Sequence, residues 1–316
     1  MKKLACLLPL AIALAACGSN DSATPPKAAA TAATAPADQP AQPPPPQSAS
    51  DAFGAKLDQA LAGSWRSDAN KARDRYRHPK QTLEFFGVKP DDTVIEITPG
   101  GGWYAELLAP ALKGSGSYVS AIEKAKKADG EAAQDKSALQ KKFEGDAADY
   151  SAAKVVEFDV NAPNFGAPAS ADVVLTFRNV HNWVMGDNDE RAQRAPEMFK
   201  AFFDVLKPGG TLGIVDHRAA VGADFEKIKE TGYLPQDFVI KLATDAGFKL
   251  VDQSEINANP KDTKDYPKGV WTLPPTLTLK EQDKDKYLAI GESDRMTLKF
   301  VKPNGDEIFH QTSDKH

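Results

Sequence analysis

Cysteine is nearly absent from this sequence of 316 residues, which contains only Cys6 and Cys17. Two thiols cannot build a disulfide framework, so stability has to come from a hydrophobic core. No C-x-x-C or H-x-x-x-H spacing occurs, and we therefore expect no built-in metal site. The G-x-S-x-G segment of a nucleophile elbow is missing too, which argues against a hydrolase of that kind.

Long hydrophobic runs are equally scarce. The run from Leu4 to Ala15 follows Lys2 and Lys3 and is too short to span a bilayer, so it has the form of a signal peptide. Residues 14–18, L-A-A-C-G, resemble the bacterial lipoprotein cleavage box. This resemblance implies cleavage before Cys17 and acylation of its thiol, and two or more acyl chains anchor a protein stably. The alternative is an ordinary secretory signal with a chance cysteine.

The residue after Cys17 is a glycine, not an aspartate. We therefore expect the protein to be sorted to the outer membrane of a Gram-negative cell, where it faces the periplasm. We thus expect a signal peptide over 1–16, a disordered Ala/Pro-rich tether over 17–50 and a folded domain over 51–316. The tether has no aromatic residue to build a core. The net charge of −5 becomes −7 without the signal peptide, which argues against nucleic acid as a partner.

Apolar runs alternate with amphipathic ones through the domain, and this alternation predicts a doubly wound, mostly parallel α/β sheet of seven strands. Expected strands are 94–97, a run ending at 123, 154–159, 171–177, 211–215, 248–251 and 296–301. Expected helices are 51–63, 79–87, 105–112, 191–206 and 236–246, with an exposed helix before 149.

A dense run of charges precedes this core. Residues 64–79 carry Arg66, Arg73, Arg75 and Arg77 around Trp65 and Tyr76. Such a run predicts a solvated helix face. Its position just before the core leaves open the alternative of a cap over a ligand cleft.

The most informative segment is V-I-E-I-T-P-G-G-G-W, residues 94–103. A strand, a glycine turn and a helix start leave backbone N–H groups facing outward, where a ligand can approach closely. Glu96 suits a ribose or an amino group and repels phosphate, which favours a nucleoside-type ligand without pyrophosphate. A glycine turn that binds nothing is the alternative.

Ligands of such sheets bind outside the carboxyl ends of the strands. This rule places five segments on one rim: Thr98–Gly102, Glu123, Asp159, Arg178–Trp183 and Asp216–Arg218. Glu123 lies 21 residues beyond Gly102, the distance at which an acid reaches ribose hydroxyls.

Three segments resemble class I S-adenosylmethionine-dependent methyltransferases. They are E-I-T-P-G-G-G, V-L-K-P-G-G-T-L-G-I-V and T-F-R-N-V, and the resemblance covers 85–251 and the last strand. The whole chain also resembles a group of predicted bacterial lipoprotein methyltransferases that have R-H-P, F-R-N-V-H-N-W and G-V-W-T-L-P-P segments. The resemblance implies S-adenosylmethionine as cofactor and methyl transfer to a small molecule.

The same resemblance implies the cofactor-binding residues. Glu96 and the loop would hold the methionine moiety, Glu123 the ribose hydroxyls, and Asp159 would lie near the adenine. Thr98 stands where the family usually has its first glycine. The loop residues of this set are Thr98, Pro99, Gly100, Gly101 and Gly102, and Asn179 after the fourth strand joins it.

Methyl transfer needs alignment and sometimes a base. His181 and His217 are the candidate bases, because an imidazole titrates near neutral pH, and Asp216 is placed to orient His217. Arg178 and Arg218 are candidates for fixing an anionic substrate group. For each histidine the alternative is a purely structural hydrogen-bonding role, and for each arginine an ion pair.

The irregular segment 257–275 is long enough to form a lid. We expect it to close the acceptor pocket, with Trp271 as an apolar wall and Tyr266 beside it; the alternative is an excursion packed on the sheet edge. Two rival functions remain open. Gly100, Gly102 and Ala105 also fit the dinucleotide fingerprint G-x-G-x-x-G/A, and an exported domain could serve as a non-enzymatic binding module.

Overall fold

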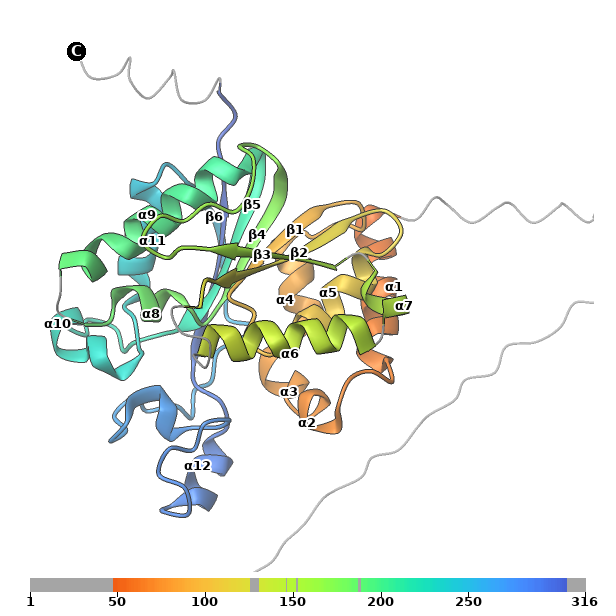
Figure 1. The fold of residues 1–316 in the computed structure, drawn as a ribbon. Helices are drawn as coiled ribbons and strands as arrows, with labels where there is room; N and C mark the ends of the chain where they lie inside the picture. Colours follow the sequence, from red (N-terminus) through yellow and green to blue (C-terminus); the bar gives the residue numbers. More distant parts are fainter. Residues whose placement is uncertain (1–47, 126–130, 146, 152, 187–188, 306–316) are drawn as a thin grey trace, which may run out of the picture. The chain divides into compact units, whose positions relative to one another are not determined.

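Seven strands form one sheet in the order β3-β2-β1-β4-β5-β7-β6 (Figure 1). The computed structural model describes residues 48–305 apart from 126–130, 146, 152 and 187–188. The signal segment, Cys17 and nearly all of the tether lie outside these residues. The strands are β1 (Thr93–Ile97), β2 (Ser117–Glu123), β3 (Ala153–Phe158), β4 (Ala171–Phe177), β5 (Leu206–His217), β6 (Lys249–Ser254) and β7 (Arg295–Val301).

Neighbouring strands from β3 to β5 run parallel, whereas β7 is antiparallel to both β5 and β6. The predicted seven-stranded, mostly parallel sheet is therefore confirmed. Because β7 runs in the opposite direction, it begins at the edge where the parallel strands end. Arg295 at its start lies opposite His217 at the end of β5.

Helices cover both faces of the sheet (Figure 1). On one face lie α1 (Ala49–Ala62), α4 (Pro79–Phe86) and α5 (Ala105–Leu112), and on the other lie α9 (Asp189–Val205) and α11 (Gln236–Asp245). The remaining helices are α2 (Asp68–Lys71), α3 (Asp74–Arg77), α6 (Glu131–Gly145), α7 (Ala147–Tyr150), α8 (Val180–Val184), α10 (Phe225–Ile228) and α12 (Lys284–Ile290), with 3-10 turns at Lys229–Thr231 and Gly269–Thr272. None of the described helices combines the length and apolar content needed to cross a bilayer.

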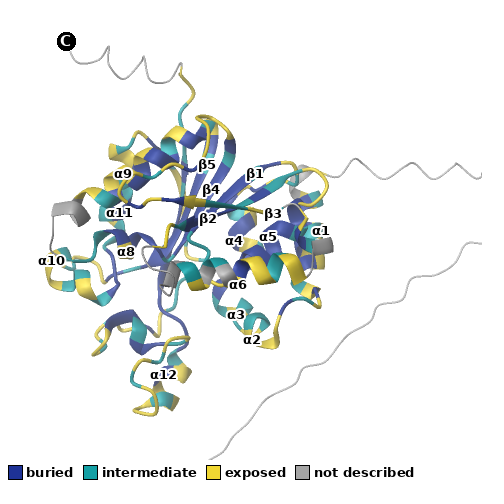
Figure 2. Ribbon diagram, viewed as in Figure 1, coloured by how far each residue is buried: buried dark blue, intermediate teal, exposed yellow. Residues whose placement is uncertain are grey.

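Separate apolar layers lie on the two faces of the sheet, and the central strands between them are mostly buried (Figure 2). Alternate side chains of a strand point to opposite faces, so Val94 packs with α1, α4 and α5, while Ile95 and Ile97 pack with α9 and α11. Phe86 of α4 is fully buried and lies over Gly213 of β5, where a Cβ would come within 2.8 Å of its ring. The missing side chain of Gly213 thus lets α4 approach the sheet.

Two predicted boundaries and one predicted surface need correction. The fifth strand begins at Leu206, before the K-P-G-G segment, because Leu206 already pairs with Ala171 ahead of a register shift. The sixth strand extends to Ser254. The charged run is not a solvated face throughout: Arg66 and Arg77 are each only 3% exposed, and Arg66 pairs with Asp74 through two hydrogen bonds of 2.8 and 2.6 Å.

Replacing Phe86 by alanine should remove the contact between α4 and the sheet. A buried phenylalanine truncated to alanine lowers the free energy of unfolding by about 3–5 kcal/mol, and urea unfolding of the purified protein measures this. Val221, which is fully exposed, provides the control, and its replacement by alanine should change stability by less than about 0.5 kcal/mol. Equal effects of the two substitutions would contradict the described packing.

Candidate functional site

A cavity of about 310 Å³ lies at the carboxyl ends of β1 and β4; we name it the loop cavity. The glycine turn forms one wall of it. A Cβ built on Gly100 or Gly101 would meet no heavy atom within 4 Å, so the backbone here is open to close approach. Gly100 has a φ of +57°, which favours glycine, whereas Gly101 has no such restriction.

Thr98 also lines the loop cavity, in a left-handed conformation with a φ of +48°. A β-branched residue rarely adopts this conformation, and strain of this kind is concentrated at functional sites. The N–H of Thr98 is held by the carbonyl of Ala121 at 2.8 Å. Thr98 therefore takes a left-handed conformation that glycine adopts more readily.

Glu96 lies at the tip of β1, is 2% exposed and lines the loop cavity. Tyr118 of β2 donates a hydrogen bond of 2.5 Å to its Oε2. Burial raises the pKa of Glu96 to about 7, and the hydrogen bond from Tyr118 and the charge of Arg77 only partly oppose this rise. Near neutral pH this carboxyl group thus exists in both its protonated and its ionised form.

The charged run before the core covers the loop cavity. Asn70, Arg73 and Arg77 line it together with Trp103, whose indole N–H donates to the carbonyl of Asn70 at 3.1 Å. The guanidinium of Arg77 lies 4.4 Å from the centroid of the Trp103 ring. The position of this run fits the alternative interpretation, a cap over the cleft.

A second cavity of about 230 Å³, the histidine cavity, shares Arg178 and Asn182 with the loop cavity. His181 and His217 line it on the sheet side, and Trp271 lines it from the segment between β6 and β7. Trp271 lies where an apolar wall was expected, with its ring centroid 6.0 Å from that of His181. Its role as part of a lid stays a prediction.

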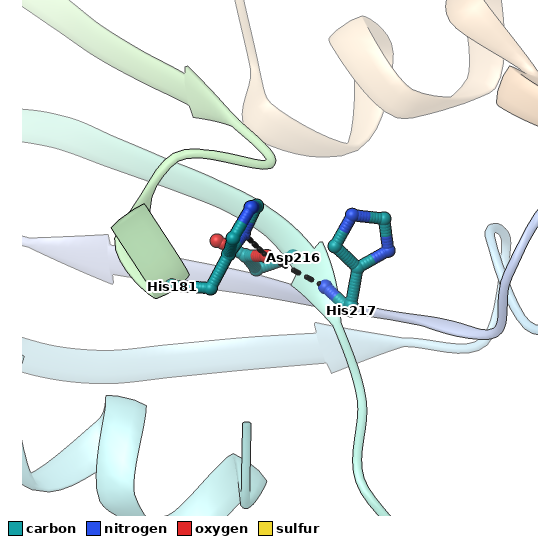
Figure 3. A group of neighbouring side chains, drawn as sticks. All are labelled: His181, Asp216 and His217. Atoms are coloured by element: carbon teal, nitrogen blue, oxygen red, sulfur yellow. Dashed lines mark hydrogen bonds and ion pairs between the residues drawn. The ribbon is translucent and has the colours of Figure 1, made fainter. Parts of the chain in front are cut away.

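Asp216 is fully buried and holds the histidine pair in place (Figure 3). Its Oδ2 accepts the N–H of Val180 at 2.7 Å, and its Oδ1 accepts the backbone N–H of His217 at 2.7 Å. His181 Nδ1 lies 2.9 Å from the same Oδ1. Carboxylate oxygens accept hydrogen bonds, so this contact fits the His181 tautomer that carries its proton on Nδ1.

The prediction that Asp216 orients the His217 ring is wrong. Adjacent residues of a strand point to opposite faces, and the carboxylate instead contacts the ring of His181 (Figure 3). The Nδ1 atom of the His217 ring forms a hydrogen bond of 2.5 Å with Ser293 Oγ. Burial, and then the nearby groups His181 and Arg178, lower the pKa of His217 well below its usual value, so its ring is neutral at neutral pH.

His181, Asp216 and His217 are also the candidate metal ligands among the described residues, with one potential ligand atom of each within 4.8 Å of the others. Asp216 Oδ1 already accepts two hydrogen bonds and Oδ2 one. These contacts favour a positioning role for the carboxylate over metal ligation. Two imidazoles alone fall short of the three protein ligands typical of a catalytic zinc site.

Asn179 occupies the predicted position beside the loop. It is 6% exposed, lines the loop cavity and donates from Nδ2 to the carbonyl of Ile97 at 2.8 Å. This bond ties the end of β1 to the turn after β4. The structure thus brings Glu96, Thr98, Pro99, Gly100, Gly101 and Asn179 together around one cavity.

Other predicted residues lie outside both cavities. Gly102 has a φ of +78° and packs against Leu139. A Cβ added to Gly102 would lie only 2.6 Å from Cδ2 of Leu139, so the position favours glycine. Glu123 is half-buried at the end of β2, and Asp159 is exposed and accepts the N–H of Asn161 at 2.9 Å. The hydroxyl of Tyr266 accepts the N–H of Thr263, away from the cavities.

Arg218 is not available for a substrate. It forms two hydrogen bonds of 2.6 Å with Glu255 and two more with Asp294. The ion-pair alternative is therefore the correct one for this residue.

The sequence patterns did not indicate Glu292, Ser293 and Arg295. Glu292 and Ser293 precede β7 and Arg295 begins it, and only the antiparallel direction of this strand carries them to the rim. Two arginines of the cap that line the loop cavity had a usable signal, since Arg73 and Arg77 are four residues apart.

No family model matches this chain, and no curated protein matches it. Among solved structures, a candidate sarcosine dimethylglycine methyltransferase from Galdieria sulphuraria is 14% identical, with a TM-score of 0.50 over 74% of this chain and 85% of that chain. A methyltransferase from Aquifex aeolicus is 14% identical, with a TM-score of 0.47 over 79% and 98% of the two chains. Geranyl diphosphate methyltransferase is 10% identical, with a TM-score of 0.49 over 78% and 94%.

At these identities the likeness concerns the fold. The chain has the Rossmann-like fold of class I S-adenosylmethionine-dependent methyltransferases. In the dinucleotide-binding fold the strand order is 3-2-1-4-5-6, whereas here an antiparallel β7 separates β5 from β6. The sheet therefore differs from that of the nicotinamide enzymes that share the glycine fingerprint.

Replacing Glu96 by glutamine tests its raised pKa. In the folded protein the carboxyl group of Glu96 has a pKa of about 7, whereas in the unfolded chain it has its ordinary pKa of 4.5. The contribution of Glu96 to the free energy of unfolding therefore falls as the pH rises from 4.5 to 7, and it stays constant above pH 7. The free energy of unfolding of Glu96→Gln, relative to the unmodified protein, should thus rise by up to about 3 kcal/mol from pH 4.5 to pH 8.

Urea unfolding across this pH range measures the difference. Glu84→Gln, at an exposed position of α4, gives the background response of a glutamate substitution. A difference for Glu96→Gln that stays constant with pH would contradict the raised pKa.

Proposed function

We propose that this protein transfers a methyl group from S-adenosylmethionine to a small-molecule acceptor. The observation that carries the proposal is the adjacency of the two cavities, which share Arg178 and Asn182. The loop cavity offers an open backbone and a carboxyl group, and the histidine cavity offers an oriented imidazole. These are the two halves that such a reaction requires: a place for a nucleoside sulfonium and a place for a nucleophile.

The residues of the loop cavity fit the cofactor. Gly100 and Gly101 leave space that any side chain would occupy, and Glu96 would pair with the amino group of the methionine moiety. The cofactor supplies a methyl group on a sulfonium, whose carbon is open to in-line attack. Tyr118 fixes the carboxyl of Glu96 in place, so this contact needs little rearrangement.

The histidine cavity would hold the acceptor. His181, fixed through Nδ1 by Asp216, takes the proton of the acceptor on Nε2. The acceptor atom would thereby be able to bond the methyl carbon that the cofactor supplies, and the electron pair of the broken carbon–sulfur bond would stay on sulfur. His217 is neutral and lies beside His181, with 5.0 Å between ring centroids, so it adds no charge that would oppose proton uptake.

A binding module without activity is the second candidate function. The strained Thr98 in the loop favours it, because a β-branched side chain crowds the approach to the backbone. Both functions use the same cavity, and they differ in whether the cofactor binds.

We further propose that the chain is a lipoprotein anchored through Cys17 in the outer membrane and facing the periplasm. The lipobox-like segment and Gly18 support this location. A cofactor made in the cytoplasm would have to reach the exported domain, so the binding measurement below bears directly on the choice between enzyme and module.

Replacing Gly101 by valine should abolish cofactor binding. The new side chain would enter open space at the cavity wall without straining the backbone. Calorimetric titration of the purified protein with S-adenosylmethionine should give a micromolar dissociation constant, which the substitution weakens at least tenfold. Gly145→Val is the matched control, since Gly145 also faces open space but lies at the end of α6, outside the loop cavity.

An unmodified protein that binds neither S-adenosylmethionine nor its demethylated product would contradict the enzyme and favour the binding module. Titration with NAD tests the remaining alternative, a nicotinamide-dependent enzyme. Thermal unfolding of each variant separates lost binding from lost folding.

Replacing Cys17 by serine should release the protein from the membrane. Without a thiol no acyl chain can be attached, and the protein should move to the soluble fraction or keep its signal peptide. Fractionation of Gram-negative cells measures this. Gly18→Asp, which keeps the cysteine, should stay membrane-bound but leave the outer membrane, and unchanged fractionation of Cys17→Ser would contradict the anchor.

A further inference from the structure

Four arginines, Arg73, Arg77, Arg178 and Arg295, lie near one another, and we call them the arginine cluster. Arg178 lines both cavities and Arg73 and Arg77 line the loop cavity, whereas Arg295 lines neither. One buried carboxylate, Glu292, accepts contacts from three of them. Arg73 Nε lies 2.6 Å from Oε1, and Arg295 Nη2 and Arg77 Nε lie 3.0 and 3.6 Å from Oε2. Burial alone would raise the pKa of Glu292, but the charges of Arg295, Arg77 and Arg73 outweigh it and lower the pKa to about 2.

Hydrogen-bond donors of the cluster remain unused. Arg77 is 3% exposed, yet its Nε and Nη2 have no hydrogen-bond partner, and neither does the buried Nη2 of Arg73. Both arginines line the loop cavity. A buried charged donor without an acceptor is strongly unfavourable, and an oxyanion in the cavity would supply the missing acceptors.

Arg178 links the two cavities. It lines both of them, and its backbone is left-handed with a φ of +62°, a conformation that costs stability in a non-glycine residue. Burial, and then the charge of Arg295, lower its pKa to about 10. The strained backbone places a further positive charge at the wall between the loop cavity and the histidine cavity.

The arginine cluster carries more positive charge than its paired carboxylate can balance, on a chain whose net charge is −5. Glu292 is the carboxylate that contacts three of the four arginines, and burial keeps Glu96, which lines the loop cavity with Arg73 and Arg77, partly protonated near neutral pH. A bound sulfonium would add more positive charge. An acceptor that is neutral or cationic would leave this excess uncompensated.

We propose that the methyl acceptor is a small organic acid whose carboxylate or phosphate group pairs with Arg178, with Arg73 and Arg77 beside it. This inference rests on the proposed function and names its substrate class. The volume of the histidine cavity, about 230 Å³, limits the part of the acceptor bound there to roughly the size of one ring. Guanidinium groups hold carboxylate and phosphate through paired hydrogen bonds, which would aim the acceptor atom at His181.

Titration of the full chain saturated with S-adenosylhomocysteine tests the proposal. The probes are acetate, benzoate and inorganic phosphate, with acetamide and benzamide as uncharged matches of the first two. At least one anion should bind, and at least tenfold more tightly than its amide where it has one. Arg178→Gln should weaken that binding at least tenfold, and it should weaken S-adenosylhomocysteine binding by a smaller factor.

Arg75→Gln is the matched control, because Arg75 is an exposed residue of α3 outside both cavities. It removes the same charge and should leave anion binding unchanged. Arg73→Gln, at a partly exposed position, gives a second cluster variant if Arg178→Gln does not fold.

Binding of none of the three anions, or equal binding of acids and amides, would overturn the proposal. So would loss of S-adenosylhomocysteine binding in the cluster variants without any anion effect, because the arginines would then serve the carboxylate of the cofactor. Failure of the protein to bind S-adenosylhomocysteine at all would instead count against the proposed methyltransferase function. If the anions still bind when S-adenosylhomocysteine does not, the arginine cluster is an anion site but the methyltransferase function is contradicted.

Discussion

The site depends on one buried carboxylate. Asp216, the second-to-last residue of β5, has no exposed surface and accepts three N–H groups: the backbone of Val180, the backbone of His217 and the ring of His181. Charge-assisted bonds of this kind are strong and directional. They fix the first turn of α8 against the end of β5, and this fixes the position of the wall that the two cavities share. A buried charge without such partners would be destabilising, so the same contacts fix both the local fold and the orientation of the His181 ring.

Local sequence predicted the sheet well. Strands such as 171–177 are apolar on both faces, and Gly87 and Pro79 mark the ends of α4 in the expected way. The rule that ligands bind at the carboxyl ends of parallel strands predicted the rim, and Glu96, Thr98 and Arg178 do lie around cavities there. Periodicity and chain direction are enough for these features, because each depends on a few consecutive residues and on the parallel arrangement they imply.

Contacts between distant segments could not be predicted in this way. Glu292 and Arg295 reach the site because β7 enters the sheet antiparallel, so its first residues lie where the parallel strands end. Arg218 is lost from the site through Glu255 and Asp294, which no local pattern connects to it. The cap was ambiguous for a similar reason: a run of arginines looks solvated until the partner that buries it, here Trp103 for Arg77, is known.

Two buried glutamates of the site, Glu96 and Glu292, differ in their surroundings. Burial dominates at Glu96 and raises its pKa to about 7, whereas arginines dominate at Glu292 and lower its pKa to about 2. Opposed shifts of neighbouring acids are typical of sites that assign them different tasks. Glu292 stays ionised and neutralises part of the arginine cluster, so it is a fixed structural charge. Glu96 can gain or lose its proton near neutral pH, and it is therefore the group that can adjust its charge when a cationic group enters the loop cavity.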